Sequence, residues 1–336
     1  MLTVRRAEIK DIPTIMQFME DYWVHDFALA HDRNFFEWQF VKDGKVNIWI
    51  GIDDETRVLY AIQSVIIYRN SQNPDVSGSV WRAIKSGNPI LALEVQEKYW
   101  NDLRPRASFS PGLRPDAIKV CKLNGNPVIT MEHYYRLSDR NDYKIAVVKE
   151  KLIPQVKDSG YRLEPIHTIA EMQKVIPESV LINGAPSKDY AYIKWRYFDH
   201  PVYKYDLWKI VTPDGQACAV LISREEHVND RIACKIVDFY GENKILGRIT
   251  TALDIMLLEK DYEFADIYSY GVPAELYENA GLVKCDTQSG NIIPHYYHPY
   301  TAANIDIFLV PLKIPGTRLF RGDSDQDKPR LITELS

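Results

Sequence analysis

The chain has 336 residues, a formal net charge of -5, 46% hydrophobic residues and 26% charged residues. At roughly 100–200 residues per domain, this length predicts two domains, and the composition is that of a globular protein. Acidic and basic residues are interspersed, which argues against the basic stripe of a nucleic-acid-binding protein and against a polybasic membrane-surface cluster.

The sequence predicts neither export nor membrane insertion. The N-terminus lacks the apolar segment of a signal peptide, and the longest apolar runs are much shorter than a transmembrane helix. Four scattered cysteines without a CxxC pair favour buried thiols over disulfides or a zinc site. We therefore expect a cytoplasmic protein without a metal, and the sequence leaves the oligomeric state open.

The order of predicted elements repeats in the two halves of the chain. Each half begins with an amphipathic helix, continues with an aromatic segment and a β-hairpin, and carries a Ser/Gly turn further on. The matching segments are 7–19 and 167–176, 32–40 and 189–197, 47–67 and 206–222, 108–112 and 267–271, and 133–135 and 295–297. Several matches in the same order at a nearly constant offset predict a duplication.

The second half has the clearer pattern. Its predicted elements are a hairpin at 205–212 and 217–225, a strand at 232–240, a helix at 244–260, a strand at 265–270, a helix at 273–279 and a last strand at 305–312. This order is typical of a mixed α/β fold, with a mixed sheet flanked by helices in each domain. We place the domains at 1–150 and 151–313, followed by a polar, extended surface tail at 314–336.

A short motif in the second half resembles the GNAT superfamily of N-acetyltransferases. Residues 274–282 match the pattern L-Y-x-x-x-G-F, with Leu282 in place of Phe. The resemblance covers 160–312 and, through the repeat, 1–140. It implies two tandem GNAT-like domains and transfer of an acyl group from acetyl-CoA or another acyl-CoA to the amine of a small molecule.

Two further segments, 195–203 and 322–327, resemble tandem proteins found with surface-polysaccharide genes, which implies an amino sugar of a polysaccharide precursor as the acceptor. Two alternatives remain open. The degenerate phosphate loops favour either a catalytically inactive GNAT-fold binding protein or an acyltransferase with a donor other than CoA.

The resemblance also implies roles for individual residues. In the family, two parallel strands splay and admit the pantetheine arm, and here the strands at 232–240 and 265–270 correspond. Tyr277 corresponds to the acid that protonates the leaving thiolate, although it could instead pack in the core. Asp238, in mid-strand, is a candidate base, although a paired structural carboxylate is an equal alternative. The candidate cofactor contacts are Phe239, Gly241, Lys244, Leu246, Gly247 and Arg248.

The phosphate loop departs from the family pattern in both halves. Glu242 adds an acidic side chain in the second half, and Pro89 removes one N–H donor in the first. In the first half, Cys121 stands where the second has Tyr277. We therefore assign the chemistry to the second domain and a structural or substrate-binding role to the first.

Three residues of the repeated aromatic segments are candidates for an acceptor cleft between the domains. They are Trp38, Trp195 and Arg196. A core anchor is the favoured alternative for the tryptophans. His295 and His298 lie between two prolines with no completing ligand set, so they are interpreted as loop histidines rather than a metal pair.

Overall fold

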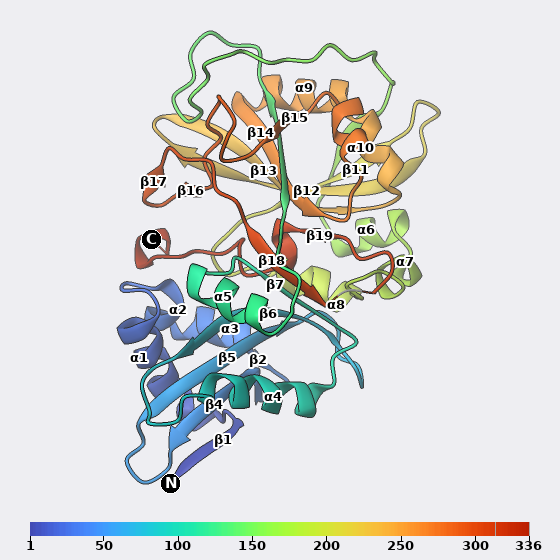
Figure 1. Ribbon diagram of the computed structural model, residues 1–336. Coiled ribbons are helices and arrows are strands. Elements are labelled where there is room, and N and C mark those ends of the chain that lie inside the picture. Colours follow the sequence, from blue (N-terminus) through green and yellow to red (C-terminus); the bar gives the residue numbers. More distant parts are fainter. Residues whose placement is uncertain (313, 336) are drawn as a thin grey trace.

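A computed structural model describes residues 1–312 and 314–335. Two mixed β-sheets, each flanked by helices, lie one above the other (Figure 1). In spatial order the first sheet contains β1 (Leu2–Arg6), β4 (Ile48–Asp53), β5 (Leu59–Ile67), β6 (Asp75–Ala83), β7 (Ala107–Pro111), β18 (Phe308–Leu312) and β8 (Ile129–Thr130).

The second sheet has the same mixed character. In spatial order it contains β10 (Arg162–Ile166), β11 (Asp206–Val211), β12 (Ala217–Val228), β13 (Arg231–Tyr240), β14 (Tyr262–Tyr270), β9 (Glu132–Leu137) and β15 (Val283–Cys285), with β19 (Leu319–Phe320) paired to β14. Two small hairpins are formed by β2 (Val41–Lys42) with β3 (Lys45–Val46) and by β16 (Tyr296–Tyr297) with β17 (Tyr300–Thr301).

Helices cover both faces of each sheet. The α-helices are α1 (Ile12–Tyr22), α2 (Ala28–His31), α3 (Arg33–Phe40), α4 (Leu91–Leu103), α5 (Pro115–Leu123), α6 (Ile169–Val175), α7 (Glu178–Ile182), α8 (Tyr190–Ile193), α9 (Thr250–Glu259) and α10 (Ala274–Asn279). The shorter 3-10 or π segments are η1 (Ile9–Asp11), η2 (Lys194–Phe198), η3 (Asn243–Arg248), η4 (Arg321–Asp323) and η5 (Ile332–Glu334).

The alternation of side chains along a strand explains how the first sheet packs against helices on both of its faces. Along β4, Ile48 and Ile50 pack with α1 and α3, whereas Trp49 packs with α4. Successive side chains of a strand point to opposite faces, so α4 and the α1–α3 group cover opposite faces of the first sheet.

The repeat is visible in matched helix caps. The Asp32 side chain accepts a hydrogen bond from Phe35 N at 2.9 Å, and Asp189 accepts one from Tyr192 N at 2.8 Å. Both aspartates satisfy a backbone N–H that a helix start leaves without an internal partner. The prediction of two GNAT-like domains in a mixed α/β fold is confirmed by this architecture and by the structural comparisons below.

The two sheets exchange strands. β9, from the first half of the chain, lies between β14 and β15, and β18, from the end of the chain, lies between β7 and β8. The prediction that residues 305–312 complete the second domain is therefore wrong. The match of 133–135 with 295–297 is also not a structural equivalence, because the first segment lies in β9 and the second enters the β16–β17 hairpin.

The reason is physical: a strand pattern specifies an alternating apolar face but not the sheet edge that accepts it. β7 and β14 have equivalent edges, and β18 and β9 pair with them in antiparallel orientation. The boundary near residue 150 remains a prediction, since strands from both sides cross it.

The C-terminal segment 314–335, called the tail here, lies between the two halves (Figure 1). Its β19 pairs with β14, and Arg321, Asp323 and Asp327 are only 5%, 1% and 0% exposed. The prediction of an extended surface segment is therefore wrong. Its polar composition concealed a buried role, because Asp323 pairs with Lys188 and Asp327 with Arg224, both of the second half.

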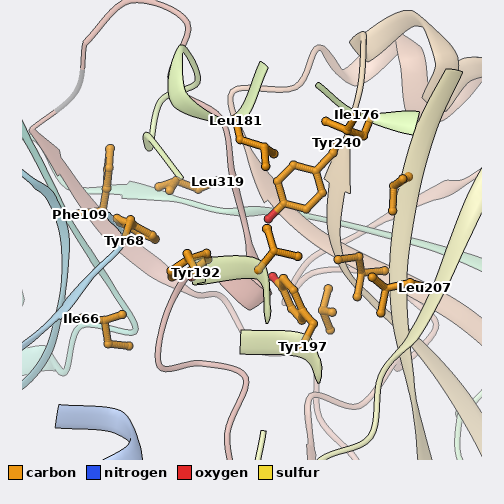
Figure 2. Packing of buried hydrophobic residues seen from close by; sticks show 14 of the residues in the cluster. Ile66, Tyr68, Phe109, Ile176, Leu181, Tyr192, Tyr197, Leu207, Tyr240 and Leu319 are labelled. Carbon is orange, nitrogen blue, oxygen red and sulfur yellow. The ribbon is translucent and has the colours of Figure 1, made fainter. Parts of the chain in front are cut away.

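A hydrophobic core joins the halves. Figure 2 shows Ile66, Tyr68 and Phe109 of the first half in one cluster with Tyr192 and Leu319 of the second half and the tail. The Tyr68 hydroxyl donates to the Asp323 carbonyl at 2.6 Å. Burial of large aromatic surfaces is strongly stabilising, so this cluster fixes the halves relative to one another. No helix in the described part of the chain has the length and apolar character needed to cross a membrane.

Candidate active site

A cleft opens in the first half where two parallel strands separate. β6 and β7 pair from Asp75 with Ala107 to Ser77 with Phe109, and then diverge. Beyond this point the edge of β6 at 78–83 has no strand partner on the β7 side among the residues that the structure describes. The cavity there has a volume of about 360 Å³.

The cleft is lined by the diverging strands and by the two helices that follow them. Representative lining residues are Ser79, Trp81 and Arg82 of β6, Ala92 and Gln96 of α4, Ser110 of β7, and Ala117 and Cys121 of α5. An unpaired strand edge presents backbone N–H and C=O groups to anything that enters. The cleft is thus able to hold an extended, amide-containing chain as an added strand.

Cys121 occupies the wall of this cleft. Its thiol is 7% exposed, and burial raises the pKa of that thiol. A raised pKa favours the protonated thiol, which is the less reactive form of cysteine.

A second pocket of about 480 Å³ adjoins the cleft, and both are lined by Trp23, Gly112 and Arg114. The remaining lining comes from the α1–α2 connection, Tyr203, Glu226 of β12, residues 295–298 and the tail. At the junction the Gln326 side chain of the tail lies over Gly112, directly after β7, where an added Cβ would lie 2.0 Å from Gln326 Nε2.

Asp325 of the tail connects the two pockets. Its Oδ2 accepts hydrogen bonds from Ser79 Oγ and Lys328 Nζ, both at 2.7 Å. Ser79 lines the cleft, while Asp325 and Lys328 line the adjoining pocket. A carboxylate supplied by the end of the chain therefore stands beside the parted strand of the first half.

The adjoining pocket contains two histidines whose pKa values shift in opposite directions. Burial, and then the nearby Arg321 guanidinium, hold the pKa of His295 well below its usual range, so this ring is neutral. A hydrogen bond with Glu226 raises the pKa of His298. Although burial opposes ionisation, Arg224 lowers the pKa of Glu226 to about 2.

The corresponding gap in the second half is filled. β13 and β14 pair in parallel as far as Ile236 with Ile267. Beyond this point β19 pairs with β14, through Ser269 with Phe320 and Tyr270 with Leu319. The segment fits closely, since a Cβ at Gly271, where φ is +80°, would lie 2.1 Å from the Thr317 carbonyl oxygen.

Arg318 secures the segment against the predicted cofactor loop. Its Nη1 donates to the Gly241 carbonyl at 2.8 Å and to Asn243 Oδ1 at 2.6 Å, and its guanidinium lies over the Phe239 ring. The backbone oxygens at the end of β13 are thus engaged by the protein itself.

Tyr277 is sealed in the second half. Its side chain is 1% exposed, stacks on Tyr134 at 4.6 Å between ring centroids, and donates to Ser269 Oγ at 2.7 Å. Burial raises the pKa of this phenol well above its ordinary value. This placement leaves the hydroxyl no access to a bound thioester, and it agrees with the core-packing alternative.

Asp238 is a paired, buried carboxylate. It is 0% exposed, lies 3.0 Å from Lys188 Nζ and accepts hydrogen bonds from the Tyr197 and Tyr240 hydroxyls. It borders a hollow of about 380 Å³ beside the tail, together with Phe239, Lys188 and Arg318. These contacts match the structural alternative, because both oxygens of the carboxylate are engaged by donors of the protein itself.

The other predicted cofactor contacts are dispersed. Leu246 is buried in the core of the second sheet, and Arg248 is exposed. Lys244 pairs with Glu242 at 2.6 Å. Gly247 is half-buried, and a Cβ added at this position would lie 3.4 Å from the Leu276 carbonyl oxygen. The structure does not bring these residues together around one cavity.

The repeated tryptophans meet each other. The Trp38 and Trp195 rings stack at 4.6 Å, and Trp195 Nε1 donates to the Trp38 carbonyl at 2.9 Å. Arg196 is 3% exposed and donates to the carbonyls of Gly322 and Asp327 at 2.9 and 2.6 Å. All three therefore join the halves and the tail, as the core-anchor alternative predicts for the tryptophans.

Sequence reasoning missed the residues where the two pockets meet. Ser79 and Asp325 come from segments 246 positions apart in sequence, and no local pattern relates them. Two signals were nevertheless present: the acidic run at 322–327 and the histidines of 295–298. Both segments border the adjoining pocket.

Two copies of a splayed parallel strand pair, each flanked by helices, define a chain of two GNAT-like domains. A protein from Enterococcus faecalis described as a probable N-acyltransferase has 9% identity and a TM-score of 0.56, covering 92% of this chain and 72% of that one. A GCN5-related N-acetyltransferase from Anabaena variabilis has 12% identity and a TM-score of 0.54, with the same coverage. No family model and no curated protein matches the sequence. At these identities the likeness establishes the fold.

Proposed function

We propose that this protein is an acyl-CoA-dependent N-acyltransferase whose donor cleft lies in the first half, between β6 and β7. The observation that carries the proposal is the contrast in occupancy: the gap in the first half is an open cavity of about 360 Å³, and the equivalent gap in the second half is filled by the tail. This moves the chemistry from the domain favoured by the sequence to the other domain.

The free edge of β6 supports this assignment. A pantetheine arm contains two amides, so it can pair with the unpartnered backbone at 78–83 as an additional strand would. The connection between β6 and α4 carries Lys85, and Arg82 lines the cleft nearby. These cations suit the phosphates of the cofactor, although Pro89 removes one backbone donor from the connection.

Acyl transfer requires a proton acceptor for the attacking amine and stabilisation of the thioester oxygen. Asp325 is placed for the first role, at the junction of the donor cleft and the adjoining pocket. Free N–H groups of β6 suit the second role. In this scheme the amine nitrogen bonds to the acyl carbon, the C–S bond breaks, and the thiolate leaves along the cleft.

The adjoining pocket of about 480 Å³ is the proposed acceptor site. It meets the donor cleft at Trp23, Gly112 and Arg114. A small amine fits this volume, and an amino sugar of a surface-polysaccharide precursor is the acceptor class that the resemblance of segments 195–203 and 322–327 favours.

The test is calorimetric titration of the full chain with acetyl-CoA. We expect saturable binding, weakened on the order of 100-fold by Ala117→Trp, which fills the cleft from α5. The matched control is Ala274→Trp, on the exposed start of α10 in the second half, which should leave the affinity unchanged. Equal weakening by both variants, or no binding to the wild type, would reject the donor cleft and favour a different donor or an inactive binding protein.

A further inference from the structure

The lining of the pocket that adjoins the donor cleft carries more cations than carboxylates. Its lining contains four cationic side chains and three carboxylates. They are Arg114, Arg321, Lys328 and Arg330, and Glu226, Asp325 and Glu334.

The three carboxylates already have partners within the protein. Asp325 pairs with Lys328 at 2.7 Å, and Glu226 pairs with Arg224. Glu334 accepts hydrogen bonds from the Tyr203 hydroxyl and from the Arg330 backbone N–H, at 2.9 and 2.8 Å. They are therefore poorly placed to neutralise the remaining cations.

Arg321 is the most deeply buried of these four cations. It is 5% exposed, and its Nε lies 3.2 Å from the Gln326 carbonyl and 3.5 Å from Asp327 Oδ1. Its Nη1 is buried without a hydrogen-bond partner among residues 1–312 and 314–335. A buried guanidinium donor without an acceptor is costly.

Asp327 cannot supply the missing charge, because three arginines share it. Arg196, Arg224 and Arg321 surround this carboxylate and hold its pKa below the ordinary range in spite of burial. With Glu226 included, three buried guanidinium groups face two carboxylates. One positive charge remains, and it borders the pocket.

His295 presents a second unused donor beside Arg321. It lines the same pocket, is 1% exposed, and its Nδ1 has no hydrogen-bond partner within the described residues. The Arg321 guanidinium is close enough to lower the pKa of this ring. A neutral imidazole with its proton on Nδ1 can donate to an anion at that place.

We propose that this pocket contains an anion subsite, formed by Arg321 and His295, and that the acceptor amine therefore carries a carboxylate or a phosphate group. The bound anion supplies the acceptor that Arg321 Nη1 and His295 Nδ1 lack and neutralises the excess charge. It orients the molecule so that the amine lies at the junction beside Asp325. The acylation step rests on the proposed function, whereas anion binding does not.

The binding experiment uses the full chain without an acyl donor. Inorganic phosphate and acetate are titrated separately by calorimetry, and the melting temperature is recorded with each, so that the two anion classes are distinguished. We expect one of them to bind saturably, with the affinity reduced at least about tenfold in Arg321→Gln. The control Arg33→Gln removes a guanidinium from an exposed ion pair on α3 and should bind as the wild type does.

The activity experiment compares acceptors that differ only in the anionic group: glucosamine 6-phosphate with glucosamine, and glycine with glycinamide. We expect a higher kcat/KM for an anionic member, lost in Arg321→Gln and partly retained in Arg321→Lys. If Arg321→Gln does not fold, His295→Gln, which removes Nδ1, is used in both experiments.

Equal anion binding by the wild type, Arg321→Gln and Arg33→Gln, or binding of neither anion, would overturn the subsite. Anion binding that depends on Arg321 without acylation of any amine would support the subsite and reject the acyltransferase.

Discussion

In the first half, β6 and β7 separate after Ser77 and Phe109 and leave a cavity; in the second half, β13 and β14 separate after Ile236 and Ile267, and residues 317–323 fill the space. Both copies thus retain the parting of the strands. The difference is that the tail, which lies outside both repeats, fills the gap of the second half only.

The tail acts differently on the two copies. In the second half it provides β19, which pairs with β14, and Arg318, which engages the end of β13. In the first half it places Asp325 against Ser79 and leaves the cleft open. The tail therefore closes the gap of the second half and completes the candidate site of the first half. The fold motif alone does not indicate which of the two gaps is open.

The largest expected effect tests the contribution of the tail to the first half. Asp325→Asn keeps the shape of the side chain but removes the base, so kcat for acyl transfer should fall by about 100-fold or more with little change in KM. Steady-state kinetics with a fixed acyl donor measures this split. Asp261→Asn, at an exposed turn position, is the control. An unchanged kcat would mean that the tail only shapes the site.

The next prediction, on the pH dependence of stability, tests whether the tail fills the gap between β13 and β14 in solution. Burial, with the Asp238 carboxylate close by, raises the pKa of Asp323 to about 6 in spite of Lys188. Since the folded state holds this proton more tightly than the unfolded chain, the associated stability is present below about pH 4 and is lost as the pH rises through 6.

Asp323→Asn removes this titration. The free energy of unfolding of the variant minus that of the wild type should therefore increase between pH 4 and 7 by up to about 3 kcal/mol. Urea denaturation at both pH values measures it, with the exposed Asp139→Asn as the control. A difference that stays constant with pH would place Asp323 in solvent and open the second gap.

The smallest effect concerns the tyrosine of the signature segment. Tyr277→Phe loses the hydrogen bond to Ser269 and should cost about 1 kcal/mol of stability, with turnover within roughly twofold of the wild type. Tyr134→Phe is the matched control in the same ring stack, because its hydroxyl is buried without a partner in the described chain. A large loss of turnover in Tyr277→Phe alone would return the chemistry to the second half.

Local features of the sequence predicted local features of the fold. The repeated segments 32–40 and 189–197 each begin with an aspartate, and the structure shows that both aspartates cap helices. The alternating strand at 60–67 and the apolar strand at 232–240 correspond to β5 and β13 within one residue at each end. The strand predictions succeed because hydrophobic periodicity acts over a few residues.

The candidate site was not predictable in the same way. Tyr277 fitted a family motif, but its surroundings are Tyr134 of the exchanged strand and Ser269. Asp325 belongs to a polar run that composition alone assigns to the surface. Both errors arise from long-range contacts. Tyr134, which stacks on Tyr277, and Ser79, which binds Asp325, each lie more than a hundred positions away in the sequence.

The sequence by itself indicated the duplication and the mixed α/β class, because repeats and short-range periodicity are visible in adjacent residues. The tertiary structure decided which strands are exchanged, where the tail lies and which gap stays open. Those outcomes depend on long-range pairing of equivalent sheet edges and on neutralisation of buried charges such as Arg224 with Asp327, and neither leaves a local pattern.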